Sequence, residues 1–253
     1  MKNYFELNED QTIEYGMIEG KSPYAYIDNF FKYPDDVITL LHHIQPNFHK
    51  DGGTSNDSLD NAPQSENLFK KDHRTLDKPT GRKNYNGEYF KDMRHEFYSD
   101  NILPAYEHLH RVLLGMGIRQ VPCDRRAVIS NCFFFKKDPW NDYENNYWWP
   151  HKDAGYSALI YLNDNDNTGT NVYKCLAPDY EGEDVREHEQ PWRPKENYEL
   201  LHNLEPKYNR AVIFDGKKYH HGMNIHDDHF AGNVTRMNLA FFFHTLQPGD
   251  APR

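Results

Sequence analysis

The chain has 253 residues, which suits one large domain or two small ones. Its net charge of −10 is the opposite of the basic excess that a nucleic-acid surface needs, so no nucleic-acid partner is expected. The three cysteines are widely spaced and form no CxxC pair: Cys123, Cys132 and Cys175. This pattern argues against a disulfide framework or a structural zinc site and favours a reducing cytoplasm as the location.

The beginning of the chain lacks the features of a signal peptide, because no apolar segment follows the first residues. No run of about 18 apolar residues predicts a membrane span either. Residues 24–31 alternate in character and predict a strand. Asp35 then begins a predicted helix that continues through Leu41 and is stopped by Pro46.

A long polar segment separates this helix from a second one. Residues 49–88 are rich in Asn, Asp, Lys and Gly, and they predict a loop of the length that often forms a functional lid. Apolar residues at near-helical spacing predict a helix over 89–116, with Pro104 expected to kink or split it.

From Ala127 onward the pattern changes to short β runs bounded by turn residues. The predicted strands are 127–135, 157–162, 171–173, 211–214 and 236–243. Helices first and strands afterwards predict an α+β fold whose C-terminal half is an antiparallel sandwich or barrel.

Three His-x-Asp triplets begin at His49, His151 and His226. Side chains at i and i+2 of a strand point to the same side, so such a pair can bind one metal ion. Context favours the triplet that begins at His151, because it runs into a clear predicted strand. The triplet at His49 lies in the polar loop, and the one at His226 is too near the C-terminus for several strands to follow. The alternative is that His151 and Asp153 are a surface pair.

A third metal ligand has to come from a later strand. His220 and His221 lie about 70 residues beyond His151, just after a predicted strand and turn, and either could supply it. Two histidines and one carboxylate on one face leave three positions open on iron, as in the facial triad of non-haem Fe(II) oxygenases. The sequence therefore predicts an iron site at His151, Asp153 and one histidine of this pair.

The last predicted strand places an arginine among apolar residues. Its alternation groups Arg236 with Asn238 and Ala240, on the face opposite Met237 and Leu239. A buried arginine needs an acidic partner, and its planar fork binds a carboxylate in bidentate fashion. The alternative is an ordinary salt bridge or an exposed strand end.

These residues together resemble the 2-oxoglutarate and Fe(II)-dependent dioxygenase superfamily, in particular its prolyl-4-hydroxylase-like branch. The pattern of that family is His-x-Asp, a distal His, and an Arg-x-Ser-like pair on the next strand. Here it corresponds to His151-Lys152-Asp153, His221-Gly222-Met223 and Arg236-Met237-Asn238. The segments 26–31, 159–163, 169–173 and 214–216 are also similar to the family.

The sequence departs from the family pattern at three points. Asn238 stands where Ser or Thr is common, Arg236 lies 15 residues past His221, and the paired His220 and His221 leave the distal ligand ambiguous. The His-x-apolar form of the family motif favours His221 over His220.

The resemblance implies a double-stranded β-helix, a jelly roll like that of cupins, within a single oxygenase domain over 1–253. Residues 127–245 would form this core and residues 1–126 a helical support. His151, Asp153 and His221 would bind Fe(II), and Arg236 would hold 2-oxoglutarate with help from Tyr161 and Asn238. Oxygen would be the second co-substrate, with ascorbate as a candidate additional cofactor.

The activity implied is hydroxylation of an unactivated C–H bond, with release of succinate and carbon dioxide. The substrate would be a protein side chain, such as a prolyl residue, or a small molecule, and residues 49–88 and 140–149 are candidates to contact it. Two alternatives stay open: a cupin-type metal enzyme that does not use 2-oxoglutarate, and a non-catalytic jelly-roll binding module.

Overall fold

The computed structural model describes residues 3–44, 93–98, 102–119, 127–133, 144–163, 169–177, 192–224 and 236–244. The predicted loop 49–88 lies outside the described residues, as do the triplets that begin at His49 and His226, so the lid stays a prediction. Within the described chain, no helix is both long and apolar enough to cross a membrane.

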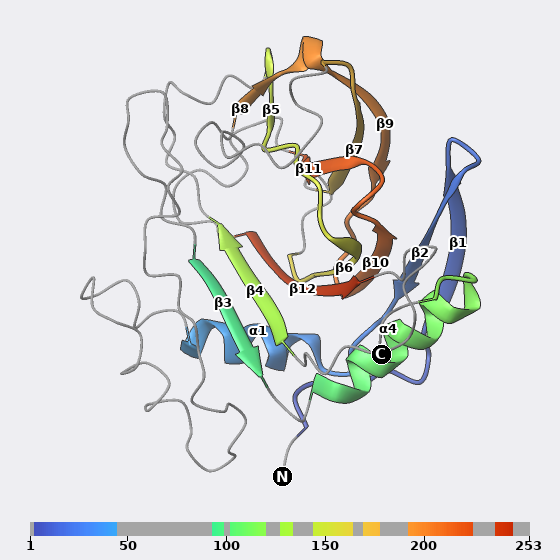
Figure 1. The fold of residues 1–253 in the computed structure, drawn as a ribbon. Coiled ribbons are helices and arrows are strands. Elements are labelled where there is room, and N and C mark those ends of the chain that lie inside the picture. Colours follow the sequence, from blue (N-terminus) through green and yellow to red (C-terminus); the bar gives the residue numbers. More distant parts are fainter. Residues whose placement is uncertain are drawn as a thin grey trace.

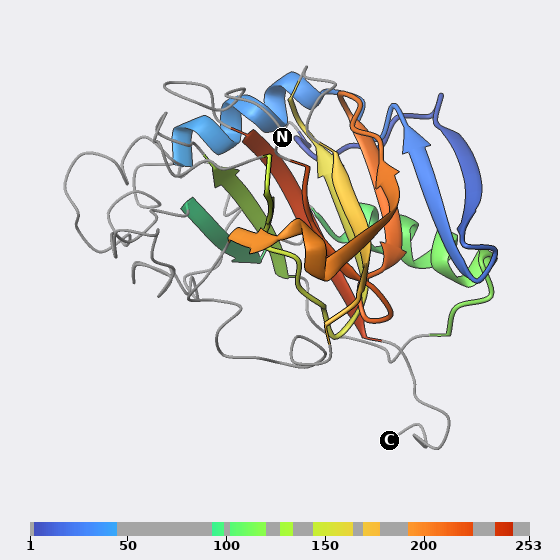
Figure 2. The same ribbon diagram turned by 90° about the horizontal axis from the view of Figure 1, so that it is seen from above.

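Antiparallel β-sheets make up most of the described structure (Figure 1). The largest sheet has the strand order β1 (Thr12–Ile18), β2 (Ser22–Asp28), β10 (Arg210–Asp215), β6 (Gly155–Tyr161), β12 (Arg236–His244), β4 (Ala127–Phe133), β3 (Met93–Tyr98). A second sheet has the order β11 (His220–Met223), β7 (Thr170–Cys175), β9 (Tyr198–Leu204). A small third sheet pairs β5 (Asn146–Trp148) with β8 (Trp192–Pro194). Figure 2 shows the largest sheet spread out from teal β3 to blue β1.

The strands from β4 onward pair in a nested way. The first of them, β4, pairs with the last, β12; further inside, β6 pairs with β10 and β7 with β9. The chain just after β5 meets β11, because the backbones of His151 and His221 exchange two hydrogen bonds of 3.0 and 2.8 Å. This half of the chain therefore folds back on itself as a long antiparallel hairpin whose strands are distributed over the three sheets.

The two faces of the largest sheet are buried in different ways. On one face, alternate residues of β6 and β12, such as Ile160 and Leu239, pack against two helices, α1 (Pro34–Ile44) and α4 (Leu103–Gly115). On the other face, Val212 packs against Val172 of the second sheet. Figure 1 shows the helices and the second sheet on opposite sides of the largest sheet. Each fully buried aliphatic side chain stabilises such packing by about 1.5–3 kcal/mol.

The helix predicted over 89–116 is wrong in its first part. Residues 93–98 form strand β3, which pairs antiparallel with β4, and the helix begins only at Leu103. Pro104 does not kink the helix: it lies in the first turn of α4, where a missing N–H costs no hydrogen bond. Backbone pairing at the edge of the sheet overrides the local helical spacing of 93–98, as tertiary context commonly does.

The N-terminal support is consequently not purely helical, because β1, β2 and β3 all extend the largest sheet. The helix predicted from Asp35 is confirmed as α1. The strand predicted over 24–31 is present as β2 but ends at Asp28, where Asn29 takes a left-handed φ of 55°. The later predicted strands are confirmed as β4, β6, β7, β10 and β12, with ends shifted by one or two residues.

A charged cluster joins the end of β2 to the start of β10. Asp28 accepts hydrogen bonds from Arg210 Nε at 2.6 Å, Arg210 Nη2 at 3.2 Å and Lys207 Nζ at 2.6 Å. The guanidinium also lies 4.5 Å from the centre of the Tyr26 ring. Burial by itself would raise the pKa of Asp28, but Arg210 and Lys207 outweigh it and the pKa is lowered.

Replacing Asp28 by Asn is expected to reduce the free energy of unfolding by about 1–2 kcal/mol at neutral pH, the order of a charge-assisted hydrogen bond. Because the folded pKa is below the unfolded value of about 3.9, this stabilisation is present above pH 4 and is lost as the pH falls through the folded pKa. Urea denaturation of wild type and Asp28→Asn across this range would measure it. Glu6→Gln is the matched control, since Glu6 pairs with Lys32 with both side chains about 40% exposed, and it should cost little. An Asp28→Asn effect as small as that of Glu6→Gln would contradict the prediction.

Candidate metal centre

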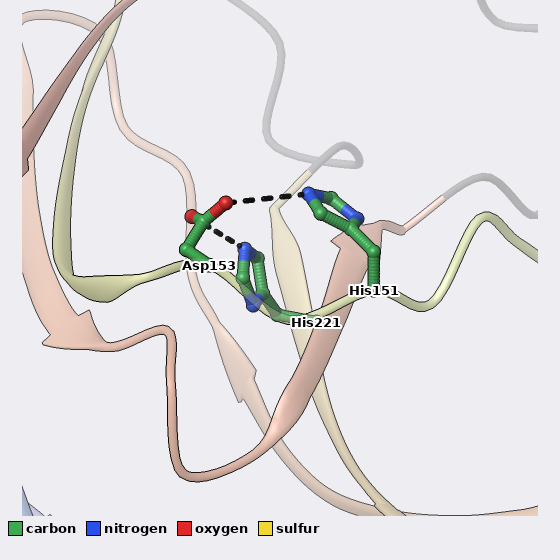
Figure 3. A group of neighbouring side chains, drawn as sticks. All are labelled: His151, Asp153 and His221. Atoms are coloured by element: carbon green, nitrogen blue, oxygen red, sulfur yellow. Dashed lines mark hydrogen bonds and ion pairs between the residues drawn. The ribbon is translucent and has the colours of Figure 1, made fainter. Parts of the chain in front are cut away.

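Three side chains predicted as metal ligands lie together in the structure. The ligand atoms of His151, Asp153 and His221 all lie within 4.8 Å of one another, and the group could hold a metal ion. Figure 3 shows the three side chains pointing toward one another. His221 Nε2 lies 3.1 Å from Asp153 Oδ2, and His151 Nε2 lies 3.9 Å from Asp153 Oδ1.

Backbone contacts with a distant part of the chain fix the positions of these residues. The i, i+2 spacing predicts that His151 and Asp153 lie in one regular strand, but they lie in the connection between β5 and β6. His151 is bridged to His221 of β11, and the Asp153 N–H donates to the Gly216 carbonyl at 2.8 Å. The His-x-Asp spacing thus brings both side chains to one place through contacts with the segment 216–221.

The register of β11 separates the two neighbouring histidines. Adjacent residues of a strand point to opposite faces. The His221 ring lies 4.5 Å from the His151 ring and 4.9 Å from the Phe214 ring. The His220 ring is buried on the other face, 5.7 Å from the ring of Tyr198. The structure therefore brings His221, and not His220, to His151 and Asp153.

The electrostatics of the group favour an ionised carboxylate. Burial by itself would raise the pKa of Asp153, but the neighbouring His221 and His151 rings and a hydrogen bond from Ser157 outweigh it, so the pKa lies well below its usual range. Asp153 is therefore a carboxylate at neutral pH, the form that binds metal ions.

The orientation of His151 is set by its other ring nitrogen. His151 Nδ1 lies 2.9 Å from the carbonyl oxygen of Trp149. A carbonyl only accepts hydrogen bonds, so Nδ1 carries the proton and the lone pair of Nε2 is left for a ligand contact. The Trp149 ring stacks on the His151 ring, with centroids 4.5 Å apart and planes 24° apart.

The Trp149 carbonyl belongs to a strained segment that passes close to β11. Trp149 has a left-handed φ of 42°, a conformation that costs a non-glycine residue on the order of 1–3 kcal/mol. Gly222 makes the crossing possible, since a Cβ there would lie 2.3 Å from the Trp148 carbonyl oxygen and 3.0 Å from that of Trp149. Gly222 and the strain at Trp149 thus both serve the placement of His151.

The residues predicted to hold a co-substrate are described only in part. Tyr161 of β6 and Asn238 of β12 are register partners and both are buried. The Tyr161 hydroxyl lies 2.8 Å from Thr170 Oγ1 of the second sheet. Among the described residues, Asn238 Oδ1 has no hydrogen-bond partner. The backbone of Arg236 opens β12 opposite Phe133, but its side chain lies outside the described residues, so its role stays a prediction.

Sequence reasoning missed three residues around the metal ligands: Ser157, Gly216 and Gly222. The sequence points to Ser157 only weakly, because it is a hydroxyl residue in an otherwise apolar strand. In the sequence, Gly216 after Asp215 indicates only a turn. Of the aromatic segment 140–149, the described Trp148 is buried and the Tyr147 ring packs 4.5 Å from that of Tyr173, and substrate contact by this segment stays a prediction.

Comparisons with known proteins assign no family to the chain. No family model and no curated protein sequence matches the chain. Among solved structures, a crystal structure of a protein from Shewanella oneidensis, provisionally named an oxygenase, is similar with a TM-score of 0.44 and 11% identity, over 90% of this chain and 84% of that one. A likeness this distant transfers no function. The fold and site themselves define a mostly antiparallel β protein with a candidate metal centre.

Proposed function

We propose that this protein is an Fe(II)- and 2-oxoglutarate-dependent dioxygenase that hydroxylates an unactivated C–H bond. The observation that carries the proposal is the convergence of two imidazoles and one ionised carboxylate at His151, Asp153 and His221. This donor set is typical of the facial triad, in which three coordination positions stay open for a chelating co-substrate and oxygen.

The strand pairing supports a double-stranded β-helix as the scaffold. Its eight strands would be β4, β5, β6, β7, β9, β10, β11 and β12, in the nested order described above. Of these, β4, β6, β10 and β12 lie in the largest sheet and β7, β9 and β11 in the second, while β5 pairs with β8. A long hairpin rolled in this way is the topology of a jelly roll, the architecture of cupins. The proposed ligands His151 and Asp153 lie between β5 and β6. The third, His221, lies on β11 and forms a backbone bridge with His151.

The residues present fit an iron ion by their own chemistry. Nε2 of His151, the Asp153 carboxylate and Nε2 of His221 would hold it. His221 Nε2 lies 3.1 Å from the Asp153 carboxylate, so both could bind one metal ion. Histidine binds a metal ion through the lone pair of a ring nitrogen, so the ring proton of His221 would lie on Nδ1 in the metal complex. Bound iron would supply the redox chemistry of oxygen activation.

Arg236 is proposed to hold 2-oxoglutarate, with help from Tyr161 and Asn238. Strand alternation puts position 236 on the same face as Asn238, whose side chain is 2% exposed. An arginine fork on that face matches the distal carboxylate of 2-oxoglutarate. In the overall reaction, one oxygen atom enters the new hydroxyl group and the other enters succinate as carbon dioxide is lost. The substrate is proposed to be a peptidyl side chain, such as a prolyl residue, or a small molecule.

The proposal is tested by measuring succinate. Protein supplied with Fe(II), 2-oxoglutarate, ascorbate and oxygen should release succinate, and prolyl peptides or free amino acids that are substrates should accelerate it. Asp153→Ala should lose this activity because it removes the charged ligand. Iron binding without any consumption of 2-oxoglutarate, across the substrate panel, would contradict the proposal and favour a cupin-type metal enzyme.

A further inference from the structure

We infer that Ser157 and Gly216 position the Asp153 carboxylate so that it binds the metal through a single oxygen. The inference rests on the proposed function and adds to it two positioning residues outside the ligand set. We call Ser157 and Gly216 the Asp153 clamp.

Ser157 forms the rigid side of the clamp. Its side chain is 1% exposed, and its backbone is paired on both sides, opposite Phe214 of β10 and Phe242 of β12. A hydroxyl buried at such a position has to find a partner. Ser157 Oγ donates a hydrogen bond to Asp153 Oδ2. Because Ser157 lies inside a sheet and Asp153 in a connection, the fixed hydroxyl positions the carboxylate rather than the reverse.

Gly216 forms the other side. Its carbonyl accepts the Asp153 N–H at 2.8 Å, which holds the backbone of the ligand. A Cβ at Gly216 would lie 2.7 Å from Ser157 Oγ, 3.0 Å from Asp153 Cβ and 3.1 Å from Asp153 Oδ2. Any side chain at position 216 would therefore push directly into the hydrogen bond between Ser157 and Asp153. The glycine is needed here for close approach, and not only for the turn after β10.

The clamp distinguishes the two carboxylate oxygens. Oδ2 accepts the hydrogen bond from Ser157 and also lies 3.1 Å from His221 Nε2. Oδ1 lies on the side of His151, 3.9 Å from its Nε2. A carboxylate with one oxygen engaged by a hydroxyl donor favours ligation through the other oxygen. A metal ion held by Asp153 would then use one oxygen of this carboxylate, which would leave three positions for other ligands.

The test uses Mn(II) with the full-length protein and reads affinity and metal-bound water together. Ser157→Ala should weaken Mn(II) by about 10–100-fold, the usual effect of losing a partner of a metal ligand. Water-proton relaxation at saturating Mn(II) should fall by about a third, because a carboxylate that binds through both oxygens takes one of about three open positions. Gly216→Ala should also lower both the Mn(II) affinity and the water-proton relaxation, because its Cβ would lie 3.1 Å from Asp153 Oδ2. Ser157→Thr keeps the hydroxyl and should restore most of the affinity.

Ser22→Ala is the matched control, since Ser22 is also 1% exposed but lies on β2, and it should leave both readouts unchanged. Thermal unfolding of each variant shows whether it is folded, and if Ser157→Ala does not fold, Gly216→Ala decides. Mn(II) affinity within about twofold of wild type, or unchanged water relaxation, in the folded clamp variant would overturn the inference. Failure of the wild type to bind Mn(II) at all would instead overturn the proposed function.

Discussion

His221→Ala is expected to abolish binding of Fe(II), or of Mn(II) in its place, whereas His220→Ala should leave metal binding close to wild type. His221 Nε2 lies 3.1 Å from the Asp153 carboxylate, while the His220 ring is on the opposite face of β11, against Tyr198. Loss of one of three protein ligands should weaken binding more than loss of an outer partner does, so at least about 100-fold. Calorimetric titration of both variants measures the difference.

The neighbouring histidine provides its own control. His220 is 1% exposed, so His220→Ala removes a buried ring and should lower the melting temperature. His221 is also buried, so both variants should lose some stability, and only His221→Ala should lose the metal. Loss of metal binding in His220→Ala alone, with both variants folded, would show that the distal ligand has been assigned to the wrong histidine.

Arg236→Leu is expected to weaken 2-oxoglutarate binding by about 2 kcal/mol or more, or roughly 30-fold, while leaving metal binding largely intact. The reason is the loss of a bidentate charged contact to the distal carboxylate from a residue outside the metal ligand set. The 2-oxoglutarate affinity of Arg236→Lys should lie between those of wild type and Arg236→Leu, because lysine keeps the charge but lacks the planar fork. The measurement is 2-oxoglutarate affinity by calorimetry, with Mn(II) in place of iron.

Arg210→Leu is a matched control for the loss of an arginine. Arg210 pairs with Asp28 at the start of β10, so its removal should lower stability without changing 2-oxoglutarate affinity. Unchanged affinity in Arg236→Leu would remove the 2-oxoglutarate assignment while leaving the metal centre untouched. The cupin-type alternative would then be the better account of the site.

The second half of the fold was predictable because its strands carry strong local signals. The run 157–162 is mostly apolar, since one face meets the helices and the other meets the second sheet. In the run 236–243 every second residue from Met237 to Phe243 is apolar and lies in the core beside the helices. The short strands β5 and β11 were not predicted, because each has only three or four residues and is defined by its partners. The sequence of β3 predicts a helix for a similar reason: its pairing with β4 cannot be seen in its own residues.

The part of the site that depends on residue type and spacing could be predicted from the sequence. The part that depends on the close approach of distant segments could not. His151 and Asp153 could be found because a His-x-Asp triplet runs into a strand. Two adjacent histidines look equivalent in a sequence, and only the face of β11 separates them. Gly216 and Gly222 are needed because distant backbone or side chains lie within 3 Å of where a Cβ would be. No local pattern contains that information.

The most direct test of the central claim is an anaerobic titration of the metal-free protein with Fe(II) and 2-oxoglutarate, followed by visible absorption. If both bind at one centre formed by His151, Asp153 and His221, a weak charge-transfer band should appear only when both are present. It should be lost in His151→Ala and in His221→Ala, and kept in His220→Ala. Absence of the band in wild-type protein that has bound Fe(II), or its persistence in both ligand variants, would contradict the account.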